Sequence, residues 1–352
     1  MKFSLLLSAA ALGFSLLASP VAAAPTVDAL PPIIPGRTTL PAHLPKADLK
    51  AEQNAMKKNG ELPPDLEQKG GMALNATEIP AGLEIRANLP LAPSSKVDDL
   101  VHYTYLSANA YCRSVVPGNK WDCAHCKPTI PDGELVTTFK SLFYDTNGYI
   151  IRSDKNKQID LAFRGTNSFR NFVADFDFLS TKYTPVEGAK VHGGFYRAYN
   201  EVAEKVVTNM RKQMDKYPDY KVAVTGHSLG GALAVLGAMD LYQRDERFSK
   251  ENMAIYTYGG PRVGNPDFAY YVTGTGIKLE RTVNNRDIVP HLPPQSFGYL
   301  HPGVEYWIRG GKKDTKVCSN TLETSLCSNS IVPFTHIFDH LAYYDINVGL
   351  CL

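Results

Sequence analysis

The pattern of apolar residues between about residues 150 and 300 contains three short runs that predict strands. Gln158–Phe163, Tyr220–Thr225 and Lys278–Asn284 are rich in β-branched residues or alternate in polarity. Five residues, 226–230, separate the second run from a long stretch of good helix formers, Gly231–Gln243. The sequence therefore predicts a strand, a sharp turn and a helix in direct succession.

The turn carries the sequence Gly-His-Ser-Leu-Gly over residues 226–230, the Gly-x-Ser-x-Gly pattern of a nucleophilic serine. Side chains at Gly226 and Gly230 are expected to collide with the neighbouring strand and helix, and Ser228 is expected to have a strained backbone. The helix N-terminus then directs its N–H groups toward an oxyanion beside the serine. An ordinary glycine-rich loop is the alternative, but the flanking elements favour a nucleophile.

The N-terminus has the features of a secretory signal peptide. Lys2 supplies a positive charge, Leu5–Leu17 forms an apolar core, and Ser19–Ala24 contains the small residues of a cleavage site. We place cleavage near Ala23, which makes residues 1–23 the signal peptide and predicts a secreted protein. The apolar core is too short for a transmembrane span, and no later stretch is long enough.

Residues 24–83 are interrupted by many prolines, and large aromatic residues are absent from Pro25 to Glu84. We expect a largely irregular segment, because it offers little apolar surface to offset the cost of ordering it. A solvated linker is one interpretation. A pro-segment that is removed on maturation is the interpretation that the secretory context favours. The one Asn-x-Ser/Thr sequon begins at Asn75, so an N-linked glycan would be attached there.

Residues 84–352 are sufficient for one large domain with a substantial core. All six cysteines lie in this part, and an even number in a secreted chain predicts three disulfides. The spacings favour two local bridges and one that joins the two ends of the domain: Cys123–Cys126, Cys318–Cys327 and Cys112–Cys351. Half of a zinc site or a redox pair is the alternative for the Cys-x-x-Cys pair, but no second such pair occurs, and we expect no metal.

A serine nucleophile needs a carboxylate that orients its histidine, and in hydrolases with this turn the acid follows the serine in the chain. Asp287 follows the predicted strand Lys278–Asn284 and is our candidate acid. The downstream acids that fit other roles lie beside a turn, in a charged loop and next to a histidine in sequence: Asp267, Asp314 and Asp339.

The general base must be one of the later histidines. His291 shares the loop of the candidate acid, and His301 begins a His-Pro-Gly turn. His340 is flanked by residues that could line an apolar pocket and is favoured over His336, but the residue pattern alone leaves both open.

The strand Gln158–Phe163 leads into Arg-Gly165-Thr166, a second candidate element of the site. A glycine followed by a small hydroxyl residue at a strand end can offer an N–H and an O–H to an oxyanion. The backbone N–H of Leu229, directly after the nucleophile, would supply the other donor.

Together these motifs resemble those of filamentous-fungal triacylglycerol lipases of the Rhizomucor and Rhizopus type. The resemblance rests on Phe-Arg-Gly-Thr, Gly-His-Ser-Leu-Gly-Gly, Gly-Gly-Pro-Arg-Val-Gly-Asn, Asn-Arg-Asp-Ile-Val-Pro-His-Leu-Pro-Pro and Phe-Asp-His-Leu. It implies an α/β-hydrolase fold, a mostly parallel central sheet with helices on both faces. It also implies a triad of Ser228, Asp287 and His340, an oxyanion hole of Thr166 and Leu229, and the three disulfides named above.

The segment Asn167–Leu179 carries apolar residues at helical spacing with polar residues on the other face. A surface helix is the simple interpretation, whereas the resemblance marks the segment as a movable lid. The lid residues are Phe169, Arg170, Phe172, Val173, Asp175 and Phe176. By the same resemblance the residues that line the acyl groove are Phe178, Ile288, Val289, Leu292 and Phe297.

We therefore expect a monomeric lipase that needs no cofactor and acts on acylglycerols at an oil–water interface. A soluble carboxylester hydrolase of the feruloyl esterase kind, phospholipase or galactolipase side activity, and a non-enzymatic binding module remain alternatives. The net charge of +2 and the absence of a Lys/Arg-rich block give no sign of nucleic-acid binding.

Overall fold

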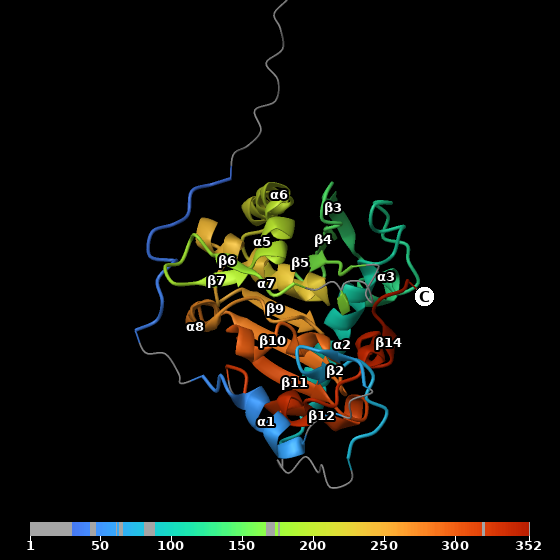
Figure 1. The fold of residues 1–352 in the computed structure, drawn as a ribbon. Coiled ribbons are helices and arrows are strands. Elements are labelled where there is room, and N and C mark those ends of the chain that lie inside the picture. The colour runs from blue at the N-terminus through green and yellow to red at the C-terminus, as the bar shows by residue number, and fades with distance from the viewer. Residues whose placement is uncertain are drawn as a thin grey trace, which may run out of the picture.

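An eight-stranded mixed sheet forms the centre of the computed structural model, which describes residues 30–42, 47–60, 62, 66–80, 89–166, 173–174, 177–318 and 321–351. The strand order is β12-β11-β10-β9-β8-β5-β4-β3, and the five strands from β11 to β5 are parallel (Figure 1). The strands are β3 Glu134–Lys140, β4 Asn147–Ser153, β5 Gln158–Phe163, β8 Lys221–His227, β9 Met253–Tyr258, β10 Lys278–Asn284, β11 Val304–Ile308 and β12 Thr315–Cys318.

The sequence placed three of these strands correctly, two of them with their exact bounds, and the helix after β8 extends two residues earlier than predicted. The longer helices are α2 Ser94–Asn109, α5 Gly193–Asn200, α6 Ala203–Lys216, α7 Leu229–Arg244 and α8 Pro266–Gly274. The short ones are α3 Cys126–Thr129, η1 Val289–His291, η2 Gln295–Phe297, η3 Lys312–Asp314, η4 Ser328–Ile331 and η5 Ile337–His340.

Helices cover both faces of the sheet because successive side chains of a strand point to opposite sides. On β8, Val222 and Val224 belong to the core cluster formed with α5, α6 and α7. Ala223 packs on the other face, against α2 and the hairpin of β13 Ala342–Tyr343 and β14 Ile346–Asn347. The mostly parallel, doubly covered sheet expected from the resemblance is therefore present.

The six cysteines form the three bridges named above, Cys112–Cys351, Cys123–Cys126 and Cys318–Cys327. Within the described ranges, no helix is long and apolar enough to cross a membrane. The signal peptide and its expected cleavage site at Ala23 lie outside the described residues.

The N-terminal segment is more ordered than its composition predicts. It contains α1 Ala51–Asn59 and a hairpin of β1 Gln68–Lys69 and β2 Met72–Ala73, which lie against the rest of the molecule (Figure 1). Its buried apolar residues are Ala51, Ala55, Met72, Ala73 and Ala76. These residues are buried although the composition offers little apolar surface, because small side chains can fill a neighbouring surface without large aromatics.

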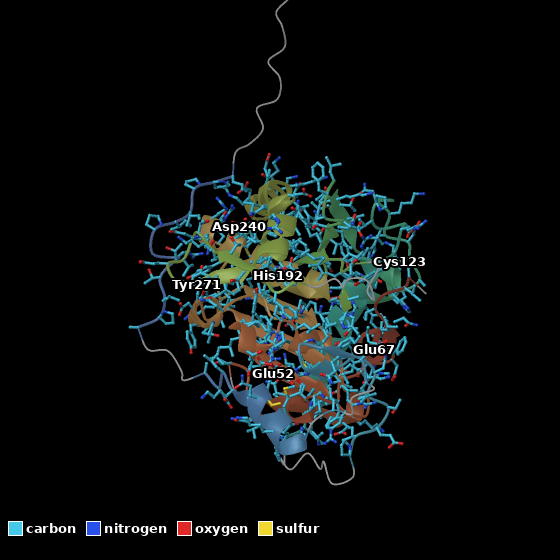
Figure 2. All side chains as sticks on the ribbon, viewed as in Figure 1. Glu52, Glu67, Cys123, His192, Asp240 and Tyr271 are labelled. Carbon is cyan, nitrogen blue, oxygen red and sulfur yellow. A yellow bond between two sulfur atoms is a disulfide. The ribbon has the colours of Figure 1, made fainter. Side chains whose placement is uncertain are left out.

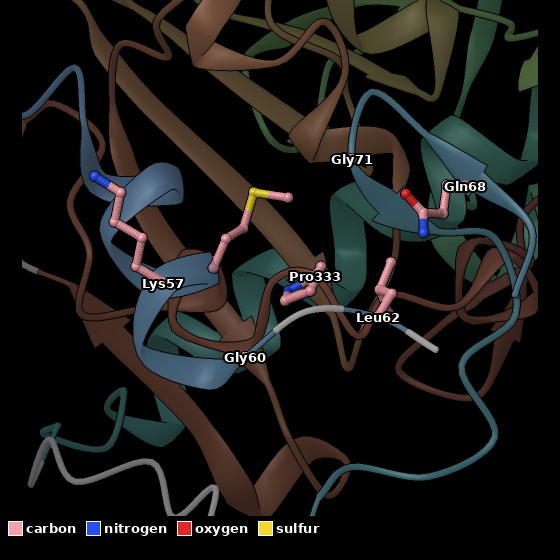
Figure 3. A pocket seen from close by; sticks show the side chains of 7 residues that line it. Lys57, Gly60, Leu62, Gln68, Gly71 and Pro333 are labelled. Carbon is pink, nitrogen blue, oxygen red and sulfur yellow. The ribbon is translucent and has the colours of Figure 1, made fainter. Parts of the chain in front are cut away.

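A cavity of about 590 Å³ lies between α1, the β1–β2 hairpin and Pro333 (Figure 3). Met56, Lys57, Gly60, Leu62, Gln68 and Gly71 supply the rest of its lining. All but Pro333 come from the N-terminal segment, so this cavity exists only while that segment is docked. It contains none of the candidate catalytic residues.

Candidate active site

Ser228 occupies the sharp turn between β8 and α7, with φ 59° and ψ −132°. This positive φ is strained for a residue with a side chain. A Cβ atom at Gly226 would overlap the carbonyl oxygen of Gly230, and one at Gly230 would overlap the carbonyl oxygen of Phe163. The two glycines are therefore required for the turn that presents the serine beside the N-terminus of α7.

Asp287 and His340 form a fully buried pair at the same edge of the sheet. His340 Nδ1 lies 2.7 Å from Asp287 Oδ2. Asp287 follows the end of β10, and β10 and β8 are parallel through β9, so the acid and the serine emerge from one sheet edge. The backbone N–H of Val289 donates to Asp287 Oδ1 at 2.8 Å, which fixes the carboxylate plane.

The other downstream histidines have structural partners. His336 lies 3.5 Å from Asp339 and is partly exposed. His291 bonds the side chain of Asn329, and His301 donates to the carbonyl of Pro290. Burial lowers the pKa of His291 to about 4 and holds the pKa of His301 well below its usual value, so both stay neutral in neutral solution.

Tyr343 is a third partner of the acid that the sequence did not reveal. Its hydroxyl donates to Asp287 Oδ2 at 2.5 Å. Burial, followed by the charge of Asp287, raises the pKa of Tyr343 well above its usual value, so the phenol remains a proton donor. Asp287 therefore accepts three hydrogen bonds, from an imidazole, a phenol and a backbone N–H.

A chain of hydrogen bonds links the strand end at Gly165 to His340. The N–H of Gly165 donates to the Tyr111 hydroxyl at 3.1 Å, and that hydroxyl lies 2.9 Å from His227 Nδ1. His227 Nε2 lies 2.9 Å from the carbonyl oxygen of His340, so Nε2 carries the proton and Nδ1 accepts from the tyrosine. Burial, and then the proximity of His340, hold the pKa of His227 well below its usual value, which keeps it neutral.

One candidate oxyanion element lies directly against the serine, and the other follows it in the chain. A Cβ atom at Gly165 would come within 2.9 Å of the Ser228 Cβ. Thr166 follows Gly165 directly, and Leu229 begins α7 on the other side of the serine. Neither Tyr111 nor His227 was selected from the sequence, since their partners are distant in the chain.

Of the five acyl-groove candidates, Ile288, Val289 and Leu292 are fully buried in the main core. Phe178 and Phe297 lie edge to face with ring centroids 4.6 Å apart, and Phe297 is exposed. The candidates thus fall into two groups: three buried residues in the loop that follows Asp287, and an aromatic pair at the surface.

Most of the expected lid, namely Phe169, Arg170, Phe172, Asp175 and Phe176, lies outside the described residues. Val173 is fully buried and helical. The amine of Lys69, in β1, donates to the carbonyl of Ala174 at 3.2 Å and lies 5.3 Å from the ring centre of Phe178. The N-terminal segment therefore contacts the lid region.

Arg262 holds the loop that follows the acid. Its Nη1 donates to the carbonyls of His291 and Pro293 at 2.7 and 2.9 Å, and its backbone N–H donates to Leu292 at 2.8 Å. The arginine of the Gly-Gly-Pro-Arg motif therefore bonds the backbone of the Asp-Ile-Val-Pro-His-Leu-Pro-Pro motif.

Two buried carboxylates bond the same guanidinium. Arg262 Nη2 lies 2.6 Å from Glu52 and 2.5 Å from Glu323, and Glu52 lies where α1 meets the rest of the molecule (Figure 2). Glu52, His291 and Glu323 are close enough to hold a metal ion in principle. Because a permanent cation already bonds both carboxylates, we interpret the cluster as an ion-pair network.

Comparison with known proteins identifies the family to which these motifs belong. The family model described as Lipase (class 3) matches residues 161–297, which include Ser228 and Asp287. A lipase of Rhizomucor miehei is 53% identical over 331 residues, covering 93% of this chain and 91% of the relative. This chain belongs to the class 3 lipase family.

Solved structures agree with this assignment and with the expected fold. The native propeptide complex of Rhizomucor miehei lipase aligns with this lipase at a TM-score of 0.85 and 52% identity, covering 92% of this chain and 100% of that chain. A structure described as a serine protease triad that forms the catalytic centre of a triacylglycerol lipase aligns at 0.73 and 54% identity, covering 75% and 100%. The resemblance inferred from the motifs is confirmed.

Proposed function

We propose that this lipase is a secreted triacylglycerol hydrolase that forms an acyl-enzyme on Ser228. One observation carries the proposal: a buried Asp287–His340 pair lies at the sheet edge where a strained turn presents the serine. A comparable centre is described for a triacylglycerol lipase of the same fold. The chemistry of ester hydrolysis needs these groups and no cofactor.

In the proposed mechanism, the Ser228 oxygen attacks the ester carbonyl carbon while His340 accepts the serine proton. Asp287 keeps the imidazole oriented and stabilises its charged form. Thr166 and the N–H of Leu229 hold the tetrahedral oxyanion, where loss of one donor typically costs about 3–4 kcal/mol. The alcohol leaves with the proton from His340, and water then repeats the sequence to release the fatty acid.

Steady-state kinetics on a soluble ester test the assignment of the base. Ser228→Ala and His340→Ala should each lower kcat by at least about 10³-fold while the protein stays folded. His336→Ala is the matched control and should retain most of the activity. The reverse ranking of the two histidine variants would refute the assignment.

The acyl chain is proposed to lie along Ile288, Val289, Leu292, Phe178 and Phe297. The first three form a buried apolar wall, and the aromatic pair continues it to the surface. A charged residue at Phe297, which is exposed and so tolerates the change, should reduce activity on long-chain esters far more than on short-chain esters. Equal losses on both would place this residue outside the acyl path.

Action at an interface is the second part of the proposal. The lid segment Asn167–Leu179 is expected to cover the groove in water and to open on lipid, since burying its apolar face in oil removes the cost of exposing it. Activity on a short-chain triglyceride should rise steeply above its solubility limit. Smooth saturation through that limit would favour the soluble esterase alternative.

Maturation is the third part. Residues up to roughly 83 are proposed to be removed as a pro-segment, with any glycan on Asn75, and a propeptide complex is described for a relative that aligns over 92% of this chain. N-terminal sequencing of the active secreted enzyme tests this directly. An N-terminus near Ala24 on fully active protein would refute removal.

A further inference from the structure

The loop between β3 and β4 exposes two adjacent large apolar side chains. Leu142 is 90% exposed and Phe143 is 82% exposed. Such exposure costs free energy in water and is rare in clusters on a soluble surface, where it marks an interaction site. Neither residue has a place in the proposed catalytic steps.

Strand pairing places this loop at the catalytic edge of the sheet. β4 is antiparallel to β5, Gly148 pairs with Phe163, and the N–H of Arg164 donates to the carbonyl of Asn147 at 2.8 Å. The loop therefore lies where β5 ends, and β5 neighbours β8, which ends at His227, directly before Ser228. Two strand spacings, about 10 Å, separate β4 from β8.

The loop is held in place beneath its apolar tip. Asp145 forms an ion pair with Arg164 at 2.6 Å, and the Thr146 hydroxyl donates to the carbonyl of Ala198 at 3.1 Å. The N–H of Phe143 donates to a carboxylate oxygen of Glu201 at 3.3 Å. These contacts fix the loop independently of the lid.

Three other exposed large apolar residues lie near the catalytic groups. Leu179 follows the lid segment, Phe297 follows the acid loop, and Phe338 precedes His340 by two residues. Leu142 and Phe143 are more exposed than any of these three.

We propose that Leu142 and Phe143 form a fixed lipid anchor, which inserts into a neutral acylglycerol surface and orients Ser228 toward it. The inference rests on the proposed action at an interface and adds a binding element that does not depend on lid opening. Both side chains are apolar, and the acylglycerol substrate of this lipase presents a neutral apolar surface, so we assign that surface as the occupant.

Adsorption measured without catalysis tests the anchor. In a Ser228→Ala background, the full chain is mixed with a triolein emulsion coated with phosphatidylcholine, and unbound protein is measured after flotation. Replacing both Leu142 and Phe143 with Ser should lower the partition coefficient about tenfold to hundredfold, because each large side chain contributes about a factor of ten when half of its surface leaves water.

The matched control replaces Leu91 and Leu326, which are 55% and 52% exposed, with Ser. Both lie beside β12, at the opposite edge of the sheet from β3: Leu91 bridges to Lys316, and Leu326 precedes Cys327, which is bonded to Cys318. This variant should adsorb within about twofold of the parent. With Ser228 intact, both variants should hydrolyse a dissolved short-chain ester at the parent rate, which shows that they fold.

The outcomes separate the two proposals. Equal adsorption of the parent and the Leu142/Phe143 variant would refute the anchor alone. Failure of the Ser228→Ala parent to adsorb would refute interfacial action and the anchor with it. Equal losses in the anchor and control variants would show a general effect of surface hydrophobicity and would also overturn the anchor.

Discussion

The two carboxylates on Arg262 lead to a prediction about the N-terminal segment that depends on pH. Glu52 belongs to α1, whereas Arg262 and Glu323 belong to the catalytic domain, and all three are buried. Replacing Glu52 with Gln removes one negative charge and one acceptor, because Arg262 bonds Oε1 of Glu52 whereas the N–H of Gln295 bonds Oε2 at 2.8 Å. The loss of the acceptor does not depend on pH in this range, so the pH dependence of the variant's stability reports the effect of the charge.

The negative charge of Glu52 contributes little net stability to the folded protein. Its carboxylate oxygen lies within 4.8 Å of one from Glu323, a separation at which two charges repel by about 3.5 kcal/mol for an effective dielectric constant of about 20. Attraction to Arg262 at a charge separation of about 4 Å returns about 4 kcal/mol. The two terms nearly cancel, and the cost of burial remains, so burial is the largest cause that raises the pKa of Glu52 above its usual value of 4.5.

The sign of the effect follows from linkage. A carboxyl whose pKa is higher in the folded state stabilises that state most below its unfolded pKa, and this stabilisation is lost as the pH rises through the folded pKa. A tenfold difference between the acid dissociation constants of the folded and unfolded states corresponds to about 1.4 kcal/mol. Glu52→Gln should therefore become more stable relative to the parent as the pH rises from 4.5 to 7.5, and at the upper pH its cost should stay within the range of about 1–3 kcal/mol expected for one unpaired buried donor.

Urea unfolding of the full chain at both pH values, with hydrogen exchange of the α1 amides, measures the effect. Glu78→Gln, an exposed acid of the same segment, is the control and should show no such trend. A loss of about 3–5 kcal/mol at pH 7.5 would show that Glu52 acts as a stabilising ion pair. Identical pH trends in the Glu52 and Glu78 variants would remove the argument altogether.

Three further outcomes follow from the site and the disulfides. Tyr343→Phe removes one donor from Asp287 and should cost about 1.5–3 kcal/mol in stability, with a lower kcat and an unchanged KM on a soluble ester; an unchanged melting temperature would contradict it. Gly165→Ala should lower kcat/KM about hundredfold by displacing the strand end, and parent-like kinetics would show that the loop adapts. Replacing Cys112 and Cys351 with Ser should cost about 5 kcal/mol on the chain-entropy model in denaturant unfolding, and a loss below about 1 kcal/mol would refute that model here.

The sequence was sufficient wherever one local pattern determines the structure. The sharp turn at Ser228 could be predicted because its glycines and the flanking strand and helix are contiguous in the sequence. Asp287 could be predicted because it follows a recognisable strand. The choice between His336 and His340 needed either the family motif or the fold, since both precede the same final segment and only the structure shows that they differ in burial and in their partners.

The parts that could not be predicted depend on contacts between distant residues. Tyr111 and His227 are 116 residues apart, and no local pattern marks a tyrosine or a histidine that completes a network. Tyr343 reaches Asp287 over 56 residues. The order of the N-terminal segment was missed for the same reason, because Ala51 and Ala55 become core residues only when the surface that they fill already exists.

The hydrogen bond between His227 and the carbonyl of His340 joins two parts of the site that are synthesised at different times. These residues are 113 positions apart, with the serine directly after the first of them. A growing chain can thus fold its nucleophile turn long before it contains the base, and the hydroxyl is then as unreactive as any other serine. The base takes its place beside Asp287 only when η5 and the β13–β14 hairpin pack against the rest of the domain. Until His340 is in place beside Asp287, this lipase has no base with which to activate Ser228 against membrane lipid.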